Sequence, residues 1–225
     1  MIGALFNSRA RRFAVAAAVG ISLSGCALLS TPKPVQTYRF GGETAAEVEP
    51  GAAARPVAVA LRRIDFPEAS KGDRILGVTG SEAAYIKGAR WISPAEILFN
   101  DALEASFAAQ PDKVRLIGRR EVGASARVLS LDVTTFEARY DVAGAVPTVV
   151  ITARARLVVL PERSVTSEKV FTISQPATEN RVSAIVEAFD VATRDLNTQV
   201  VEWTAQEIDT TATPTAPGRP SPSRG

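Results

Sequence analysis

The stretch from Pro147 to Leu160 decides the fold, and it reads PTVVITARARLVVL. Every second residue in it is apolar: Val149, Ile151, Ala153, Ala155, Leu157 and Val159. The residues between them include Thr148, Thr152, Arg154 and Arg156. Side chains of a strand point alternately to its two faces, so the pattern predicts a strand with one buried and one wet face. Such alternation is typical of antiparallel sheets.

Two more stretches with a strand pattern flank this one. Arg127–Arg139 alternates before it, and Val165–Ile173 follows it after a turn at Pro161–Ser164. We therefore expect a three-stranded antiparallel meander. Asp132 and Glu137 have opposite parity on the first of these strands, which predicts that they face opposite sides of the sheet and form no acid–base pair.

Shorter strands are expected earlier in the chain. Their apolar and β-branched residues fall in the ranges Val57–Phe66, Ile75–Val78, Ala83–Trp91 and Val114–Ile117. The piece Val35–Phe40 is compatible with an edge strand.

Two amphipathic helices are predicted, and each has one apolar stripe. The first starts at Ser93-Pro94-Ala95-Glu96, which reads as a capping box with Pro at the first helical position. Its stripe is Ala95, Leu98, Phe99, Ala102, Leu103 and Phe107. The second spans Asn180–Gln206, with the stripe Val182, Ile185, Val186, Phe189, Leu196, Val200 and Trp203. This stripe is interpreted as core packing, and a lipid groove is the alternative. The expected fold is α+β, with both helices packed on one face of a mainly antiparallel sheet.

The amino-terminal segment has the features of an export signal. Arg9, Arg11 and Arg12 precede an apolar run, Phe13–Leu23, and no acidic residue lies before Cys26. The run is too short to span a bilayer, which takes about 20 residues.

A bacterial lipobox ends this segment. Leu23, Ser24 and Gly25 lead to Cys26, so an aliphatic residue and two small residues precede a thiol that can accept diacylglycerol. We expect cleavage before Cys26 and several acyl chains on it, which together give stable anchoring. Neither of the two residues after Cys26 is Asp, which favours the outer membrane.

Composition divides the remaining chain into three parts. Residues 26–55 are rich in Ala, Pro, Gly and Glu and are expected to form a lipidated, flexible tether with an r.m.s. reach of ~30 Å. Residues 1–25 are the expected signal. Residues 56–208 form the expected globular domain. Residues 209–225 contain no large apolar side chain after Ile208 and are expected to be disordered.

Charge and composition exclude several function classes. Removal of the signal leaves 23 basic and 24 acidic residues, a net charge of −1, so nucleic-acid binding is not expected. The chain has no His and a single Cys, which excludes Ser-His-Asp and Cys-His couples and His-based zinc sites. It also has no phosphate-binding Walker loop. We therefore expect no enzyme activity, no metal and no cofactor.

Four residues are candidates for binding a partner protein. Arg90 and Trp91 are residue types favoured in protein interfaces, although Trp91 is equally suited to pack under the first helix. Arg154 and Arg156 lie on the predicted wet face of their strand, where they can grip acidic groups or simply be solvated.

The ordered set of motifs resembles the ABC-type transport auxiliary lipoprotein component family, of the type that includes paraquat-inducible protein C. The resemblance follows the lipobox, covers roughly Tyr38 to Trp203 and departs from the expected pattern at Phe40, where we expect Leu. The pieces that carry it are Tyr38–Phe40, Ala89–Trp91, Leu103–Ser106, Leu131–Glu137, Ala153–Leu157, Lys169–Phe171, Ala188–Ala192 and Trp203.

The resemblance implies a role in lipid transport across the bacterial envelope. The implied partners are a mammalian-cell-entry (MCE) protein and the permease and ATPase of an ABC transporter, with this lipoprotein at the outer-membrane end. The alternative is a scaffold or regulator lipoprotein for cell-wall synthesis or outer-membrane assembly, because small α+β domains on lipidated tethers serve there too.

Overall fold

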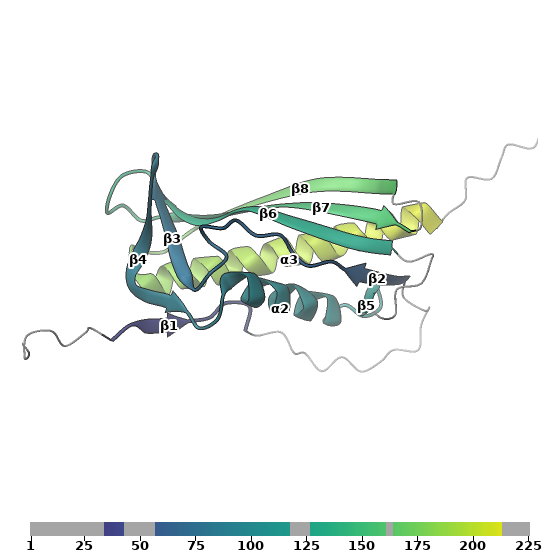
Figure 1. Cartoon of the computed structure of the whole chain (residues 1–225), viewed down its shortest axis with the longest axis horizontal. Helices are drawn as coiled ribbons and strands as arrows, with labels where there is room; N and C mark the ends of the chain where they lie inside the picture. Colours follow the sequence, from purple (N-terminus) through teal and green to yellow (C-terminus); the bar gives the residue numbers. More distant parts are fainter. Residues whose placement is uncertain (1–33, 43–56, 118–126, 161–163, 213–225) are drawn as a thin grey trace, which may run out of the picture. The chain divides into compact units, whose positions relative to one another are not determined.

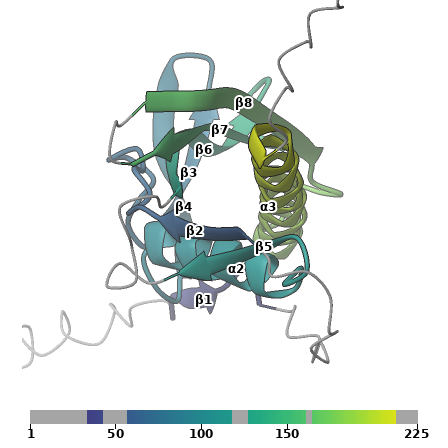
Figure 2. The same ribbon diagram turned by 90° about the vertical axis from the view of Figure 1, so that its right-hand side faces the viewer.

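The computed structural model of the chain describes residues 34–42, 57–117, 127–160 and 164–212. Within these ranges, eight strands form one sheet that is accompanied by two helices (Figure 1). The α+β class predicted from the sequence is confirmed. Viewed end-on, the sheet is curved, and α3 runs along its open side (Figure 2).

The expected antiparallel meander is present. It consists of β6 (Arg127–Tyr140), β7 (Thr148–Val159) and β8 (Ser164–Pro176), which pair in that order. The predicted inner face of β7 is confirmed for five of its six residues, which are fully buried: Val149, Ile151, Ala153, Ala155 and Leu157. The sixth, Val159 at the end of the strand, is only partly buried.

The rest of the sheet is mixed, so the expectation of a mainly antiparallel sheet is only partly right. The other strands are β1 (Gln36–Tyr38), β2 (Val57–Leu61), β3 (Arg74–Thr79), β4 (Glu82–Trp91) and β5 (Val114–Ile117). β3 and β4 pair antiparallel. Four pairs of described strands are parallel, namely β1–β4, β2–β5, β2–β6 and β3–β6.

The length of β6 explains how these parallel pairs arise. Its start pairs with β2, where Val59 lies opposite Arg127, and its end pairs with β3, where Gly77 lies opposite Ala138. One edge of a single long strand therefore accepts two short strands in succession. Residue alternation reports which face a side chain takes but not the direction of the neighbouring strand.

A bulge in β6 corrects one prediction about its acidic residues. The register with β7 shifts between Val133 and Thr135, and this one-residue slip exchanges the two faces of the strand from there on. Asp132 and Glu137 consequently lie on the same, outer face, not on opposite faces. Glu137 accepts a hydrogen bond of 2.7 Å from Arg139 Nη2.

Both helices pack on the same face of the sheet. The ring of Phe136 on β6 lies 6.2 Å from that of Phe99 on α2 (Ala95–Ala108) and 4.8 Å from that of Phe189 on α3 (Val182–Ala212). The predicted stripe of α2 is buried, and so is that of α3 apart from Val182, which is partly buried. The stripe of α3 is therefore core, not the lining of a lipid groove.

The predicted capping box of α2 is wrong. The N-cap residue is Pro94, and no side chain caps this helix. Two backbone carbonyls take the place of the Ser93 hydroxyl: Ala95 N donates to Gly72 O (2.9 Å) and Glu96 N to Lys71 O (3.2 Å). Free N–H groups at the helix start are thus satisfied by a nearby turn.

Two predicted boundaries move. β2 ends at Leu61, and only an isolated bridge from Asp65 to Asp132 continues its line toward Pro67. α3 continues to Ala212, so the first residues assigned to the disordered tail are helical. Residues 213–225 lie outside the described part of the chain.

Candidate functional site

The segment that follows the expected tether is built into the domain. β1 pairs in parallel with β4, with Thr37 opposite Arg90, and lies at the end of the sheet, as predicted for an edge strand. Phe40, only 2% exposed, packs its ring 4.9 Å from Trp91 and 5.4 Å from Phe136. This short segment therefore joins the hydrophobic core through an aromatic side chain.

The turn after Phe40 holds the segment in place. Gly41 N donates a 2.7 Å hydrogen bond to Asp190 Oδ1 on α3, and the other oxygen of Asp190 pairs with Arg194. Gly41 has a φ of +71°, and a Cβ built on it would lie 2.5 Å from the Cβ of Ala102 on α2. Both conditions require glycine. We call Phe40, Gly41 and Asp190 the clip.

The clip corrects the predicted start of the domain at residue 56. A compact unit runs from Gln36 onward, so part of the segment assigned to the tether belongs to this unit. Ten Cα–Cα steps separate Cys26 from Gln36 in the sequence and span at most ~36 Å. Cys26 and the lipobox residues Leu23, Ser24 and Gly25 lie outside the described residues.

Trp91 is not available to a partner. It is 2% exposed, and its ring packs against Phe40 and, at 5.3 Å, against Phe189. The core interpretation therefore replaces the docking role for this residue. Its neighbour Arg90 is half-exposed and pairs with Asp73, with 2.8 Å between Arg90 Nη1 and Asp73 Oδ2. Partner binding by Arg90 stays a prediction.

Arg154 and Arg156 share one carboxylate on the outer face of the meander. Glu168 Oε2 lies 2.7 Å from Arg156 Nε, and Glu168 Oε1 lies 3.7 Å from Arg154 Nε. Asp132 lies opposite Arg154 in the register of β6 and β7, so two carboxylates accompany the two guanidinium groups on this face. Binding of a partner's acidic group by Arg154 and Arg156 stays a prediction.

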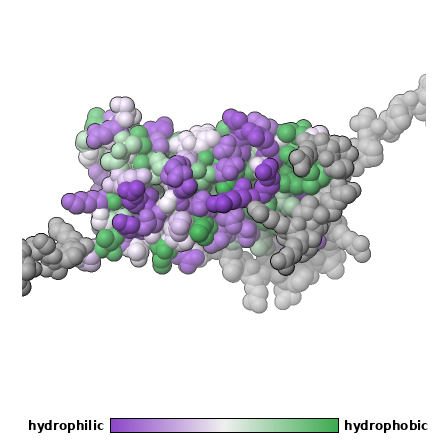
Figure 3. Space-filling view, viewed as in Figure 1, coloured by the Kyte–Doolittle hydropathy of each residue, from purple (hydrophilic) through white to green (hydrophobic). Residues whose placement is uncertain are grey.

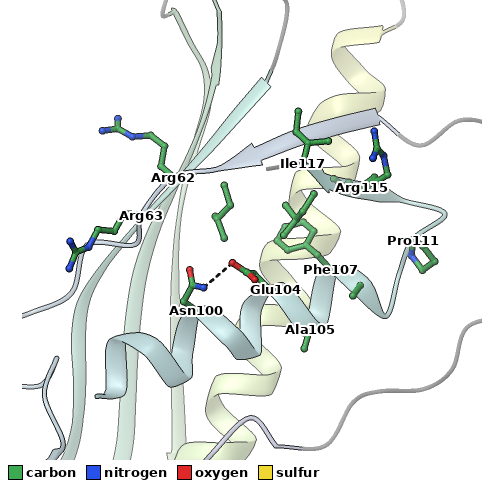
Figure 4. A pocket seen from close by; sticks show the side chains of 13 residues that line it. Arg62, Arg63, Asn100, Glu104, Ala105, Phe107, Pro111, Arg115 and Ile117 are labelled. Carbon is green, nitrogen blue, oxygen red and sulfur yellow. Dashed lines mark hydrogen bonds between the residues drawn. The ribbon is translucent and has the colours of Figure 1, made fainter. Parts of the chain in front are cut away.

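An open groove of about 810 Å³ lies between α2 and the ends of β2 and β5 (Figure 4). Its apolar lining comes from both layers: Leu61, Ala105, Phe107, Ala108, Pro111, Val114, Leu116 and Ile117. All four residues of β5 contribute to it, because β5 is the last strand of the sheet on this side.

Arginines stand on the rim of this groove. Arg62 and Arg63 lie at the end of β2, where Arg63 Nη2 is 3.5 Å from Glu96 Oε1, and Arg115 lies on β5 (Figure 4). On α2, Asn100 Nδ2 donates a hydrogen bond of 2.9 Å to Glu104 Oε1. The two polar side chains that α2 contributes to the groove are therefore paired with each other. An apolar floor with a basic rim can hold an apolar segment that carries acidic groups. On the face shown in Figure 3, polar and apolar residues are otherwise interspersed.

Nothing in the described ranges assembles a metal site, since no group of three or more acidic, His or Cys side chains converges there. Burial raises the pKa of Tyr140 above its ordinary value of 10.0, because the phenolate loses hydration. No helix among the described residues is long and apolar enough to cross a membrane.

Sequence reasoning missed the clip and the groove. The signal for the clip was Phe40-Gly41-Gly42 directly after the Tyr38-Arg39 motif, where an aromatic residue precedes a turn. The acceptor Asp190 is 149 residues away and is not visible from local pattern. The groove forms because β5 is the last strand of the sheet and pairs with β2. This pairing of distant segments is not visible in the local sequence pattern.

Comparison with known families decides the identity. The model of the ABC-type transport auxiliary lipoprotein component family matches residues 38–201. The chain belongs to this family. The match begins inside β1 and ends inside α3, so it includes the clip, the groove and the arginine pair. No curated protein matches the chain.

Solved structures of distant relatives share the fold of this auxiliary lipoprotein. A protein from Xanthomonas campestris is 24% identical with a TM-score of 0.62, over 72% of this chain and 93% of its own. A hypothetical protein from Chlamydia trachomatis is 12% identical with a TM-score of 0.50, over 69% of this chain and 99% of its own. At these identities the likeness concerns the fold alone.

Proposed function

We propose that this auxiliary lipoprotein is a non-enzymatic component of an ABC/MCE-type lipid transport system in the bacterial envelope. It is anchored through Cys26, on the periplasmic face of the outer membrane. The observation that carries the proposal is the family match over residues 38–201 directly after a lipobox. The family name associates the chain with ABC-type transport, while the MCE protein and the lipid cargo are part of our proposal.

The groove supports contact with a protein of that transporter. Its apolar floor and the rim of Arg62, Arg63 and Arg115 complement an apolar segment with acidic groups, and we assign this segment to the MCE protein. Arg154 and Arg156 offer a second, smaller surface on the outer face of β7.

A binding role also agrees with the chemistry that the chain offers. It contains no His, and the acidic side chains Asp190 and Glu168 are engaged by a backbone amide or by arginines. An assay of the domain against ester, glycoside and phosphoester substrates should show no turnover, and a reproducible turnover would contradict a non-enzymatic role.

Affinity purification from membranes tests the proposal. The tagged, acylated protein should recover an MCE protein together with a permease and ATPase, and mass spectrometry should find acyl chains on Cys26. A Cys26→Ser variant is the control, because it should leave the membrane fraction while keeping its fold. Recovery of a cell-wall synthase or an outer-membrane assembly barrel in place of the transporter would favour the alternative role.

A further inference from the structure

The edge of the sheet next to the tether carries an exposed face with both apolar and basic residues. In the parallel pair, Thr37 lies opposite Arg90, and Arg39, two residues after Thr37, is also exposed. Ile92 continues β4 on the same side, since its N–H donates 2.7 Å to Tyr38 O. We call this set of four, Thr37, Arg39, Arg90 and Ile92, the β1–β4 outer face.

A large aliphatic side chain is exposed on this face. Ile92 is 65% exposed, whereas Trp91 and Ala89 on the opposite side of β4 are buried. Arg39 has no acidic partner among the described residues, whereas Arg90 is paired with Asp73. The face therefore combines an exposed isoleucine with one arginine that is unpaired within the described ranges.

Chain length brings this face close to lipid. Ten residue-to-residue steps separate Cys26 from Gln36 at the start of β1, and ten steps reach at most ~36 Å. The anchor proposed at Cys26 would therefore keep this edge of the sheet within that distance of the bilayer. β8 lies on the other side of the domain in both Figure 1 and Figure 2.

We propose that the β1–β4 outer face rests on the lipid–water interface and orients the domain on its membrane. Ile92 enters the interface, and the guanidinium groups of Arg39 and Arg90 bind lipid phosphates from above, as long basic side chains do at membrane surfaces. The inference rests on the lipid anchor at Cys26 that the proposed function includes.

This small face suits a lipid surface better than a protein partner. A stable protein interface buries about 800 Å² on each side around an apolar centre, which one exposed aliphatic side chain does not provide. A tethered domain needs much less, because the anchor already keeps it at a high effective concentration beside the bilayer. The basic residues further match anionic phosphate groups.

Spin-label accessibility tests the orientation in the acylated protein. The chain has a single cysteine, Cys26, whose thiol is consumed by the lipid, so a Cys at position 92 (Ile92→Cys) takes the nitroxide alone. The protein is reconstituted into vesicles that contain anionic phospholipid. Collisions of the label with oxygen and with a water-soluble nickel chelate are then compared with those of a Val170→Cys label on β8, a site that is 54% exposed.

We expect the label at position 92 to show a several-fold higher ratio of oxygen to nickel collisions than the label at position 170. Equal ratios at the two positions would overturn the proposal. A fall of both collision rates at position 92 would also overturn it, since burial by protein, such as a second copy, excludes both reagents. If the labelled protein does not float with the vesicles, the anchor at Cys26 fails, and the orientation fails with it.

A charge variant provides a second readout. Arg39→Glu in the Ile92→Cys background should move the ratio toward the aqueous value, because the glutamate repels the phosphates. Arg181→Glu is the matched control, since Arg181 is 68% exposed at the start of α3 and outside this face. An unchanged ratio in Arg39→Glu, or an equal change in Arg181→Glu, would contradict the role of the basic residues.

Discussion

The backbone amide of Gly41 donates a hydrogen bond of 2.7 Å to Asp190, and this single contact joins residues 149 positions apart. It joins the turn after β1 to α3. With the anchor that we propose at Cys26, a pull on the amino-terminal end of the chain would therefore reach the core through this contact.

Asp190→Asn should loosen this connection without unfolding the domain. The amide oxygen can still accept from Gly41, but the charge that strengthens the bond and pairs with Arg194 is lost, at a cost of about 1–2 kcal/mol. Hydrogen exchange of the Gly41 amide should accelerate. Asp195→Asn, an exposed position on α3, serves as the control, and equal acceleration in both variants would contradict the clip.

Gly41→Ala should destabilise the domain more than Gly80→Ala does. Both glycines have a positive φ, but a Cβ at position 80 meets nothing within 4 Å, whereas a Cβ at position 41 collides with Ala102. We expect about 1 kcal/mol for the turn glycine and at least about 2–3 kcal/mol for Gly41. Chemical denaturation measures both, and equal losses would show that Ala102 moves aside freely.

Arg62→Glu should weaken recovery of the MCE protein. The substitution reverses a charge at the rim of the groove, where Arg62 forms no ion pair with a described residue, so folding stability should change by less than about 0.5 kcal/mol. Lys87→Glu on β4 is the control for net charge. A normal yield of the partner with Arg62→Glu would remove the groove from the proposed interface.

The double variant Arg154→Gln, Arg156→Gln separates two roles for this pair. If the two arginines are only solvated on the outer face of β7, the free energy of unfolding of the variant should fall by about 0–1 kcal/mol, because these ion pairs are half-exposed. If the pair binds an acidic partner group, recovery of the partner should fall and lose part of its salt dependence. Titration of the purified complex with salt distinguishes these outcomes.

The partly buried Tyr140 should make the domain less stable at alkaline pH. Burial raises its pKa in the folded state above 10.0, while the unfolded chain keeps the ordinary value. The unfolded state therefore releases its proton first, and the free energy of unfolding falls as the pH rises from about 10 through the folded pKa. Urea denaturation at several pH values should show this fall, and Tyr140→Phe should reduce it.

The sequence predicts which face of each long strand and helix is buried. It does not predict which strands pair with one another. Alternation over Val149–Leu157 and the stripes of both helices report burial, which each residue experiences locally. Parallel pairing of β2 and β3 with the two ends of β6 depends on chain segments that are far apart. The bulge at Val133–Thr135 inverts the parity of the later residues of β6, and no residue type there signals it.

The candidate site is less predictable for a related reason. Arg90, Arg154 and Arg156 are on the surface as expected, but Trp91 suits two roles, since sequence alone does not distinguish a buried aromatic residue from an interface one. Its ring packs against Phe40, which lies in the segment predicted from composition to be a tether. The lipobox at Cys26 remains a sequence-based prediction.

Phe40 fills the gap between rings contributed by β4 and β6, and Phe189 of α3 adjoins those same rings. In the role that we propose, the chain is exported amino end first and acylated at Cys26, so Phe40 would cross the membrane before Phe189. The aromatic cluster could then close only after its last helix arrives. Acylation at Cys26 could therefore precede completion of the core.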